Sequence, residues 1–184
     1  MKLAIKLGLA GVIALPCLPA IAQPDSTNYV SYVDPADYVF LAHETTLDLF
    51  GSVSVGQETI DELTRERVED NGRLGAGLGL NHFVGRHVGV GVDAYTENTQ
   101  HSFVDNTSGN LIIRFPFDAV RLAPYVYGGA GYQFDPTGLW FGQAGGGLDF
   151  RFTKKLGLFV DARYVFTDGT ENFGVGRLGL RFGF

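Results

Sequence analysis

The chain has almost no cysteine and very little lysine. Its 184 residues include one cysteine, Cys17, and the only lysines after the first ten residues are Lys154 and Lys155. A single cysteine excludes an internal framework of disulfide bonds. A soluble barrel protein covers its outer surface with lysine and glutamate, and this sequence has too few lysines to do so. No helical periodicity of any length follows residue 23, which argues against a helical fold.

The charge of the chain excludes a further class of function. The formal net charge is −6, and residues 1–22 contain two lysines and no acidic residue, so the chain without them carries −8. Negative charge is the wrong sign for binding nucleic acid, and we expect no nucleic-acid partner. The roughly 160 residues that follow residue 22 fit a single domain.

The first 22 residues have the pattern of a secretory signal peptide. Lys2 and Lys6 give a positive region, residues 7–15 are apolar, and an A-x-A motif ends at Ala22. We therefore expect cleavage after Ala22. The apolar stretch is shorter than the ~20 residues that a transmembrane helix needs, which disfavours a membrane anchor. A lipoprotein signal ending at Cys17 is a weaker alternative, because proline precedes that cysteine.

Eight segments of about ten residues alternate between apolar and polar side chains, and a period of two predicts β-strands. Ten residues is also the length that a tilted membrane-spanning strand needs. Short connections alternate with longer ones. The predicted strands are residues 43–55, 72–83, 88–97, 109–117, 123–134, 139–152, 156–167 and 173–184. The short connections are residues 84–87, 118–122 and 153–155, a tight loop covers 135–138, and the longer connections are 56–71, 98–108 and 168–172.

The polar faces of these segments carry charges of both signs in equal number. In residues 156–167, for example, Val160 and Ala162 alternate with Asp161 and Arg163. The planar guanidinium of arginine suits buried ion pairs better than lysine does. We therefore predict that the polar faces line an interior of paired charges. The twelve predicted members are Glu44, Asp48, Arg73, Asp93, Glu97, Arg114, Asp149, Arg151, Asp161, Arg163, Arg177 and Arg181.

The last eight residues carry the most specific motif. They read RLGLRFGF, with a polar residue at Arg177, glycine at Gly179 and aromatic residues at Phe182 and Phe184. This stretch resembles the C-terminal β-signal of bacterial outer-membrane barrels, and the chain resembles the small eight-stranded barrels of the OmpA/OmpX type. The resemblance implies that the barrel-assembly machinery reads Arg177, Gly179, Phe182 and Phe184.

That resemblance also implies a fold, a location and a function. The expected fold is all-β, an eight-stranded antiparallel up-and-down transmembrane β-barrel over residues 43–184, preceded by an N-terminal periplasmic segment, residues 23–42. The expected location is the bacterial outer membrane, with its lipids and lipopolysaccharide as partners and the protein as a monomer. Such a barrel is just wide enough for side chains to fill. We therefore predict a structural or surface-interaction role, a plugged lumen, no enzymatic activity and no cofactor.

Two other functions stay open. One is a narrow pore for small solutes or ions, which an unbalanced set of interior charges would favour. The other is a lipid-modifying outer-membrane enzyme, which would bring histidine, serine and a carboxylate together. His101 and Ser102 are adjacent in sequence, so on a strand they would face opposite sides. The histidines at 43, 82, 87 and 101 lack the spacing of metal ligands, and we predict no metal site.

Aromatic residues gather near the ends of the predicted strands. Tyrosine and tryptophan prefer the interface between membrane and water, where one side of the ring is apolar and the other is wet. We predict that Tyr132, Trp140, Tyr164 and Phe166 form an aromatic girdle. The other aromatic residues near strand ends are Tyr95, Tyr125, Phe134, Phe173, Phe182 and Phe184.

Overall fold

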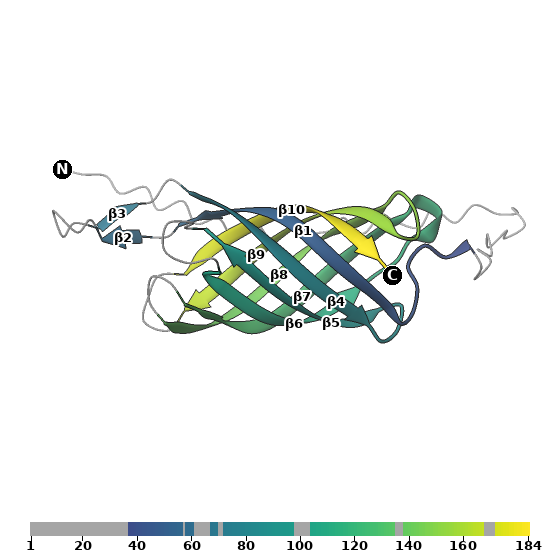
Figure 1. The fold of residues 1–184 in the computed structure, drawn as a ribbon, viewed down its shortest axis with the longest axis horizontal. Helices are drawn as coiled ribbons and strands as arrows, with labels where there is room; N and C mark the ends of the chain where they lie inside the picture. The colour runs from purple at the N-terminus through teal and green to yellow at the C-terminus, as the bar shows by residue number, and fades with distance from the viewer. Residues whose placement is uncertain are drawn as a thin grey trace, which may run out of the picture. The chain divides into compact units, whose positions relative to one another are not determined.

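The computed structural model shows eight strands closed into one antiparallel β-barrel (Figure 1). The structure describes residues 37–56, 58–60, 67–69, 72–97, 104–134, 138–167 and 172–184. The predicted signal peptide, His101 and Ser102 lie outside the described residues. Within the described ranges, no helix is long and apolar enough to cross a membrane.

The barrel strands follow the predicted segments closely, and the predicted fold class is confirmed. The strands are β1 (Glu44–Val55), β4 (Arg73–Phe83), β5 (Val88–Thr96), β6 (Asn106–Arg114), β7 (Leu122–Gln133), β8 (Leu139–Arg151), β9 (Leu156–Thr167) and β10 (Phe173–Gly183). Two further strands, β2 (Glu58–Ile60) and β3 (Arg67–Glu69), pair with each other within the first predicted long connection.

β6 is the strand whose predicted bounds, 109–117, differ most from the structure. It starts and ends three residues earlier, at Asn106 and Arg114. Pro116 has no N–H to donate on the side of β5, whereas pairing with β7 continues as far as a bridge between Phe117 and Leu122. The chain then turns through the short 3-10 helix η2 (Asp118–Val120).

The barrel is closed by β1, which pairs with β4 on one side and with β10 on the other. Hydrogen-bonded partners followed once around the barrel from Glu44 lead to Ser54, ten residues further along β1. Eight strands with this shear tilt by roughly 40° and enclose an interior that side chains fill. The ladder reaches the last residue, because the main chains of Thr45 and Phe184 exchange two hydrogen bonds.

The connections divide the barrel into two ends. Residues 84–87, 115–121 and 152–155 connect strands at the end where β1 begins and β10 finishes, which we call the short-turn end. The connections that follow β1, β5, β7 and β9 lie at the opposite end, which we call the long-loop end.

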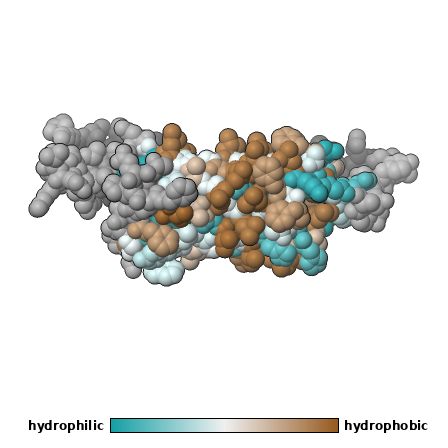
Figure 2. Space-filling model, in the orientation of Figure 1, coloured by the Kyte–Doolittle hydropathy of each residue, from teal (hydrophilic) through white to brown (hydrophobic). Residues whose placement is uncertain are grey.

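Side chains alternate between the outside and the inside of the barrel. In β8 and β9, Leu148 and Val160 are exposed on the outer wall, whereas Asp161 and Arg163 are buried inside, as the alternation predicts. Figure 2 shows hydrophobic side chains gathered over the middle of the barrel. The outer wall is therefore the apolar surface and the interior is the polar one, which is the reverse of a soluble barrel.

Candidate functional site: the charged interior of the barrel

The first group of interior charges lies at the short-turn end and centres on Glu44. Its two carboxylate oxygens bind Arg151 Nη1 at 2.6 Å and Arg114 Nη1 at 2.9 Å. These arginines belong to β8 and β6, neither of which is next to β1. The two ion pairs therefore cross the interior, and all three side chains are buried.

The next ion pairs extend this group along the barrel axis. Arg151 Nε binds Asp149 Oδ1 at 3.0 Å, and Asp149 Oδ2 binds Arg181 Nη1 at 2.8 Å. Arg181 also holds Asp48 with two hydrogen bonds of 2.7 Å. Asn81 donates to Asp48 at 2.9 Å, so this carboxylate is bound from two sides. The result is one continuous network from Arg114 to Asp48.

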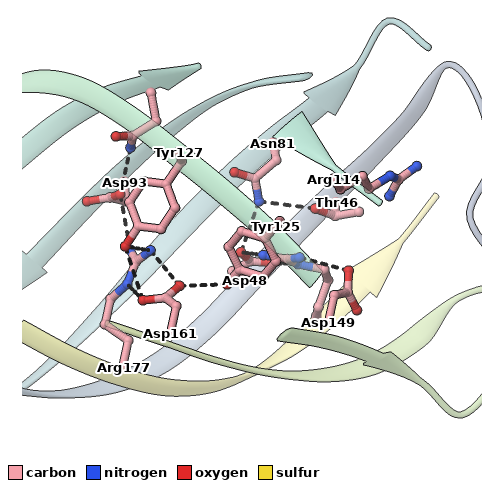
Figure 3. A network of polar contacts seen from close by, with 12 residues as sticks. Thr46, Asp48, Asn81, Asp93, Arg114, Tyr125, Tyr127, Asp149, Asp161 and Arg177 are labelled. Carbon is pink, nitrogen blue, oxygen red and sulfur yellow. Dashed lines mark hydrogen bonds and ion pairs between the residues drawn. The ribbon is translucent and has the colours of Figure 1, made fainter. Parts of the chain in front are cut away.

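A second group of charges lies closer to the long-loop end (Figure 3). Arg177 binds Asp161 with two hydrogen bonds of 2.8 Å and binds Asp93 at 3.1 Å. Arg163 also binds Asp93, at 3.3 Å. The hydroxyls of Tyr125 and Tyr127 donate to Asp161 at 2.7 and 3.2 Å, and both tyrosines are buried.

The two groups together are electrically balanced. Five arginines and five carboxylates take part in the ion pairs just described, and every one of the ten side chains is at most 9% exposed. The prediction of paired arginine and carboxylate side chains inside the barrel is confirmed. The ion pairs among these ten side chains matter because a charge left unpaired in a confined interior costs several kcal/mol.

The structure places two of the predicted members apart from these networks. Arg73 is the first residue of β4, at the long-loop end. Glu97 follows β5 at the same end, and its main-chain N–H donates to Asp105 at 2.6 Å. The Glu97 Oε1 atom is buried without a hydrogen-bond partner.

The short-turn end is covered by residues just before β1, which belong to the segment that the sequence analysis predicts to be periplasmic. Phe40 is 0% exposed, and the guanidinium carbons of Arg114 and Arg151 each lie 5.4 Å from the centre of its ring. Arg114 Nη2 also donates to the carbonyl of Leu41 at 2.7 Å. The stretch from Val39 to Leu41 thus packs against the layer of the interior network that lies at the short-turn end.

An aspartate on η2 anchors this segment. The main-chain N–H groups of Val39 and Phe40 donate to Asp118 Oδ1 at 2.9 and 3.3 Å. Arg86 forms an ion pair with Asp118 and donates to the carbonyl of Phe40 at 3.1 Å. Sequence reasoning missed Arg86 and Asp118. The one available signal was the apolar, aromatic stretch Tyr38 to Leu41, which is unusual for a solvated linker.

The four residues of the predicted aromatic girdle lie on the outer wall. Trp140 is 73% exposed, Tyr164 and Phe166 are about half exposed, and Tyr132 packs against Trp140 with ring centres 5.2 Å apart. Among the other aromatic residues near strand ends, Tyr95, Tyr125 and Phe173 are buried in the interior. Each of these three occupies the inward parity of its strand, so nearness to a strand end does not by itself place an aromatic residue in the girdle.

The residues of the C-terminal motif have different environments. Phe184 is 72% exposed, whereas Arg177 points into the interior network. Gly179 is packed tightly, because a Cβ at this position would lie 2.7 Å from the ring of Phe159 and from Phe50 Cβ. Arg177 and Gly179 therefore have structural roles inside the barrel, in addition to any role in recognition.

No protein-family model and no curated protein sequence matches the chain. Solved structures do match. The N-terminal β-barrel domain of OprF from Pseudomonas aeruginosa is 17% identical, with 78% of this chain and 99% of that chain covered and a TM-score of 0.59. Neisserial surface protein A is 13% identical, with 77% and 96% covered and a TM-score of 0.51. Ail, the attachment invasion locus protein of Yersinia pestis, is 15% identical, with 78% and 100% covered and a TM-score of 0.51. The chain therefore has the fold of the small eight-stranded β-barrels of bacterial outer membranes.

Proposed function

We propose that the protein is an integral barrel of the bacterial outer membrane with a structural or surface-interaction role, and that it does not conduct ions or solutes. The short-turn end then faces the periplasm, and the long-loop end faces the outside of the cell. The apolar outer wall contacts lipid, and the long loops contact the surroundings of the cell. The fold, the apolar wall and the secretory signal pattern support this location.

The observation that carries this proposal is the set of ion pairs that cross the interior. Glu44 joins strands that are three positions apart around the barrel, and Arg177 does the same with Asp93. Phe40 covers the short-turn end of the same path. An ion that moved along the axis would have to displace charges that already satisfy one another, and that displacement is costly in a confined interior.

Conductance measurements test the proposal. The mature protein, refolded and inserted into planar lipid bilayers, should give no stable current steps above those of the lipid alone. A double variant, Asp161→Ala with Arg177→Ala, removes one balanced pair and should increase leakage. A matched control, Leu148→Ala on the outer wall, should behave like the natural protein. Stable current steps from the natural protein would favour the narrow-pore alternative instead.

We further propose that outer-membrane lipids and lipopolysaccharide surround the protein, that the barrel-assembly machinery recognises its last strand, and that it works as a monomer without a cofactor. The lipid-modifying alternative gains no support from two histidines in the described residues. His82 Nδ1 lies 3.0 Å from Thr45 Oγ1, and His87 Nδ1 lies 3.2 Å from the carbonyl of Arg114. Neither hydrogen bond joins histidine to serine or to a carboxylate.

A further inference from the structure

Three interior arginines bind a carboxylate in the same way. The Nε and Nη2 atoms of a guanidinium lie on one edge, and that edge matches the two oxygens of a carboxylate. Arg177 holds Asp161 through this edge at 2.8 and 2.8 Å, and Arg181 holds Asp48 at 2.7 and 2.7 Å. Arg151 uses it for Asp149, at 3.0 and 3.3 Å.

Arg163 is different, although its side chain is 0% exposed. Among the described residues its single ion-pair partner is Asp93, which it reaches through Nη1 at 3.3 and 3.4 Å. In the same part of the chain, both atoms of its carboxylate-binding edge, Nε and Nη2, are buried without a hydrogen-bond partner. The guanidinium carbon lies 4.7 Å from the centre of the Tyr95 ring, and this contact supplies no acceptor to the edge.

The surroundings of Arg163 contain further polar atoms without partners. Each step from a residue to its paired residue on the next strand shifts the position along the barrel axis by a little more than one residue. With this shift taken into account, the register places Ser52, Tyr95 and Gln143 at nearly the same level of the barrel as Arg163. Each of these three carries a buried side-chain oxygen without a hydrogen-bond partner. Buried polar atoms are rarely left unsatisfied in native proteins, so five of them on four residues at one level call for an explanation.

We propose that the free edge of Arg163 is a binding site for a small oxyanion, a carboxylate or a phosphate-like group, which enters from the long-loop end. The planar edge supplies two N–H donors at the spacing of two anion oxygens. The hydroxyls of Tyr95 and Ser52 provide further donors at the same level of the interior. The ion pairs of Arg177 and Asp161 lie below this level and stop the ligand from passing further.

The direction of entry follows from the residues above Arg163. On one side the interior at the long-loop end is filled by a buried apolar cluster of Phe141, Val165, Phe173 and Val175. On the other side the inward positions are Ser54 in β1 and Gly75 in β4, both of which are small, and the side chain of Glu97 lies over Gly75, with its Cγ 3.1 Å from where a Cβ of residue 75 would stand. Glu97 lies at that end as well, and its unpartnered carboxyl oxygen makes it the natural competitor for the same edge.

Arginine-side-chain NMR tests the proposal on the mature protein in a phosphate-free detergent. The ¹⁵N–¹H signal of Arg163 Nε is followed while inorganic phosphate or acetate is added at constant ionic strength. The expected result is a saturable shift at millimolar concentration for Arg163 alone. The Nε signals of Arg177 and Arg181 should stay in place, because Asp161 and Asp48 already occupy their edges.

Three variants make the outcome decisive. Arg163→Lys keeps the charge but removes the edge, and should abolish the saturable response. Tyr95→Phe removes an unpartnered hydroxyl without removing the ring, and should weaken binding even if Arg163→Lys does not fold. Glu97→Gln should lower the half-saturation concentration. A uniform drift of all arginine signals would overturn the proposal, and so would a large shift of Arg163 Nε in Glu97→Gln before any anion is added, because Glu97 would then be the occupant.

Discussion

Arg163 and Asp93 face each other across the full width of the barrel. Arg163 lies on β9 and Asp93 on β5, and three strands separate them in either direction around the sheet. The Nη1 atom of Arg163 is 3.3 Å from Asp93 Oδ1. Since the same carboxylate also binds Arg177, Ser108 and Asn110, one aspartate connects β5 with β6, β9 and β10.

Asp93→Ala should therefore be among the most damaging interior substitutions. It leaves Arg163 and Arg177 each without one anionic partner, and we expect a loss of about 3–5 kcal/mol in the free energy of unfolding. Urea unfolding in lipid vesicles, followed by tryptophan fluorescence, measures this loss. The control is Ser108→Ala, which removes one hydrogen bond to Asp93 and the acceptor for Asn110 and Gln143, and should cost about 1–2 kcal/mol. Equal effects of the two variants would contradict the importance of the ion pairs.

Substitutions of the adjacent β9 residues Val160 and Asp161 should act through different surroundings, the membrane for Val160 and the barrel interior for Asp161. Val160 is 46% exposed on the outer wall, and Val160→Arg should cost roughly 2–4 kcal/mol if this position lies near the membrane midplane. Asp161→Ala acts through the interior, where the aspartate binds Arg177 and two tyrosines. Unfolding should be measured in a bilayer and in detergent micelles. The arginine variant should lose much of its effect in micelles, and the alanine variant should keep it; the reverse result would refute the inside–outside assignment.

Deletion of Phe184 should impair assembly in cells more than folding in vitro. Its side chain is 72% exposed, and its removal leaves the ladder between Thr46 and Gly183 intact. We expect less heat-modifiable protein in the membrane fraction but nearly normal refolding into detergent. The control is Phe152→Ala, which removes another exposed aromatic ring and leaves the last strand unchanged. Normal membrane levels of the deletion variant would argue against the assembly-signal interpretation.

Asp118→Ala should release the segment that covers the short-turn end. The substitution removes the acceptor for the N–H groups of Val39 and Phe40. A hydrogen bond to a charged group stabilises by about 1.5–3 kcal/mol, so amide exchange at both positions should accelerate roughly tenfold or more. Exchange within β1 should not change. Arg121→Ala, in the same connection but bonded to Phe152, is the control and should leave Val39 and Phe40 protected.

The sequence was sufficient to predict the strands, and the faces of most of them, because the period of two runs through each segment between the predicted connections. Asp161 and Val160 could be assigned to opposite faces from their neighbours alone. The choice of partner could not be predicted in this way. Glu44 binds Arg114 and Arg151 because a shear of ten residues brings β1, β6 and β8 to the same level, and the shear depends on the register of all eight strand pairs.

One further feature lay beyond the reach of the pattern. The packing of Phe40 depends on a side chain from η2, Asp118, which lies 78 residues away in the chain. Contacts of this kind join a segment without periodicity to a turn, so no local signal in the sequence specifies them.

The pairing of Asp48 with Arg181 has a consequence for the order in which the protein can fold. These residues are opposite each other where the first and last strands meet, and they are 133 positions apart in the chain. A sheet that has not yet closed leaves both charges without this partner. A closure displaced by two residues would keep the apolar wall outside but place Arg181 opposite Thr46 or Phe50 instead of an aspartate. The ion pair between Asp48 and Arg181 thus disfavours misaligned pairing of β1 with β10. The alternation of hydrophobic residues alone would allow that pairing.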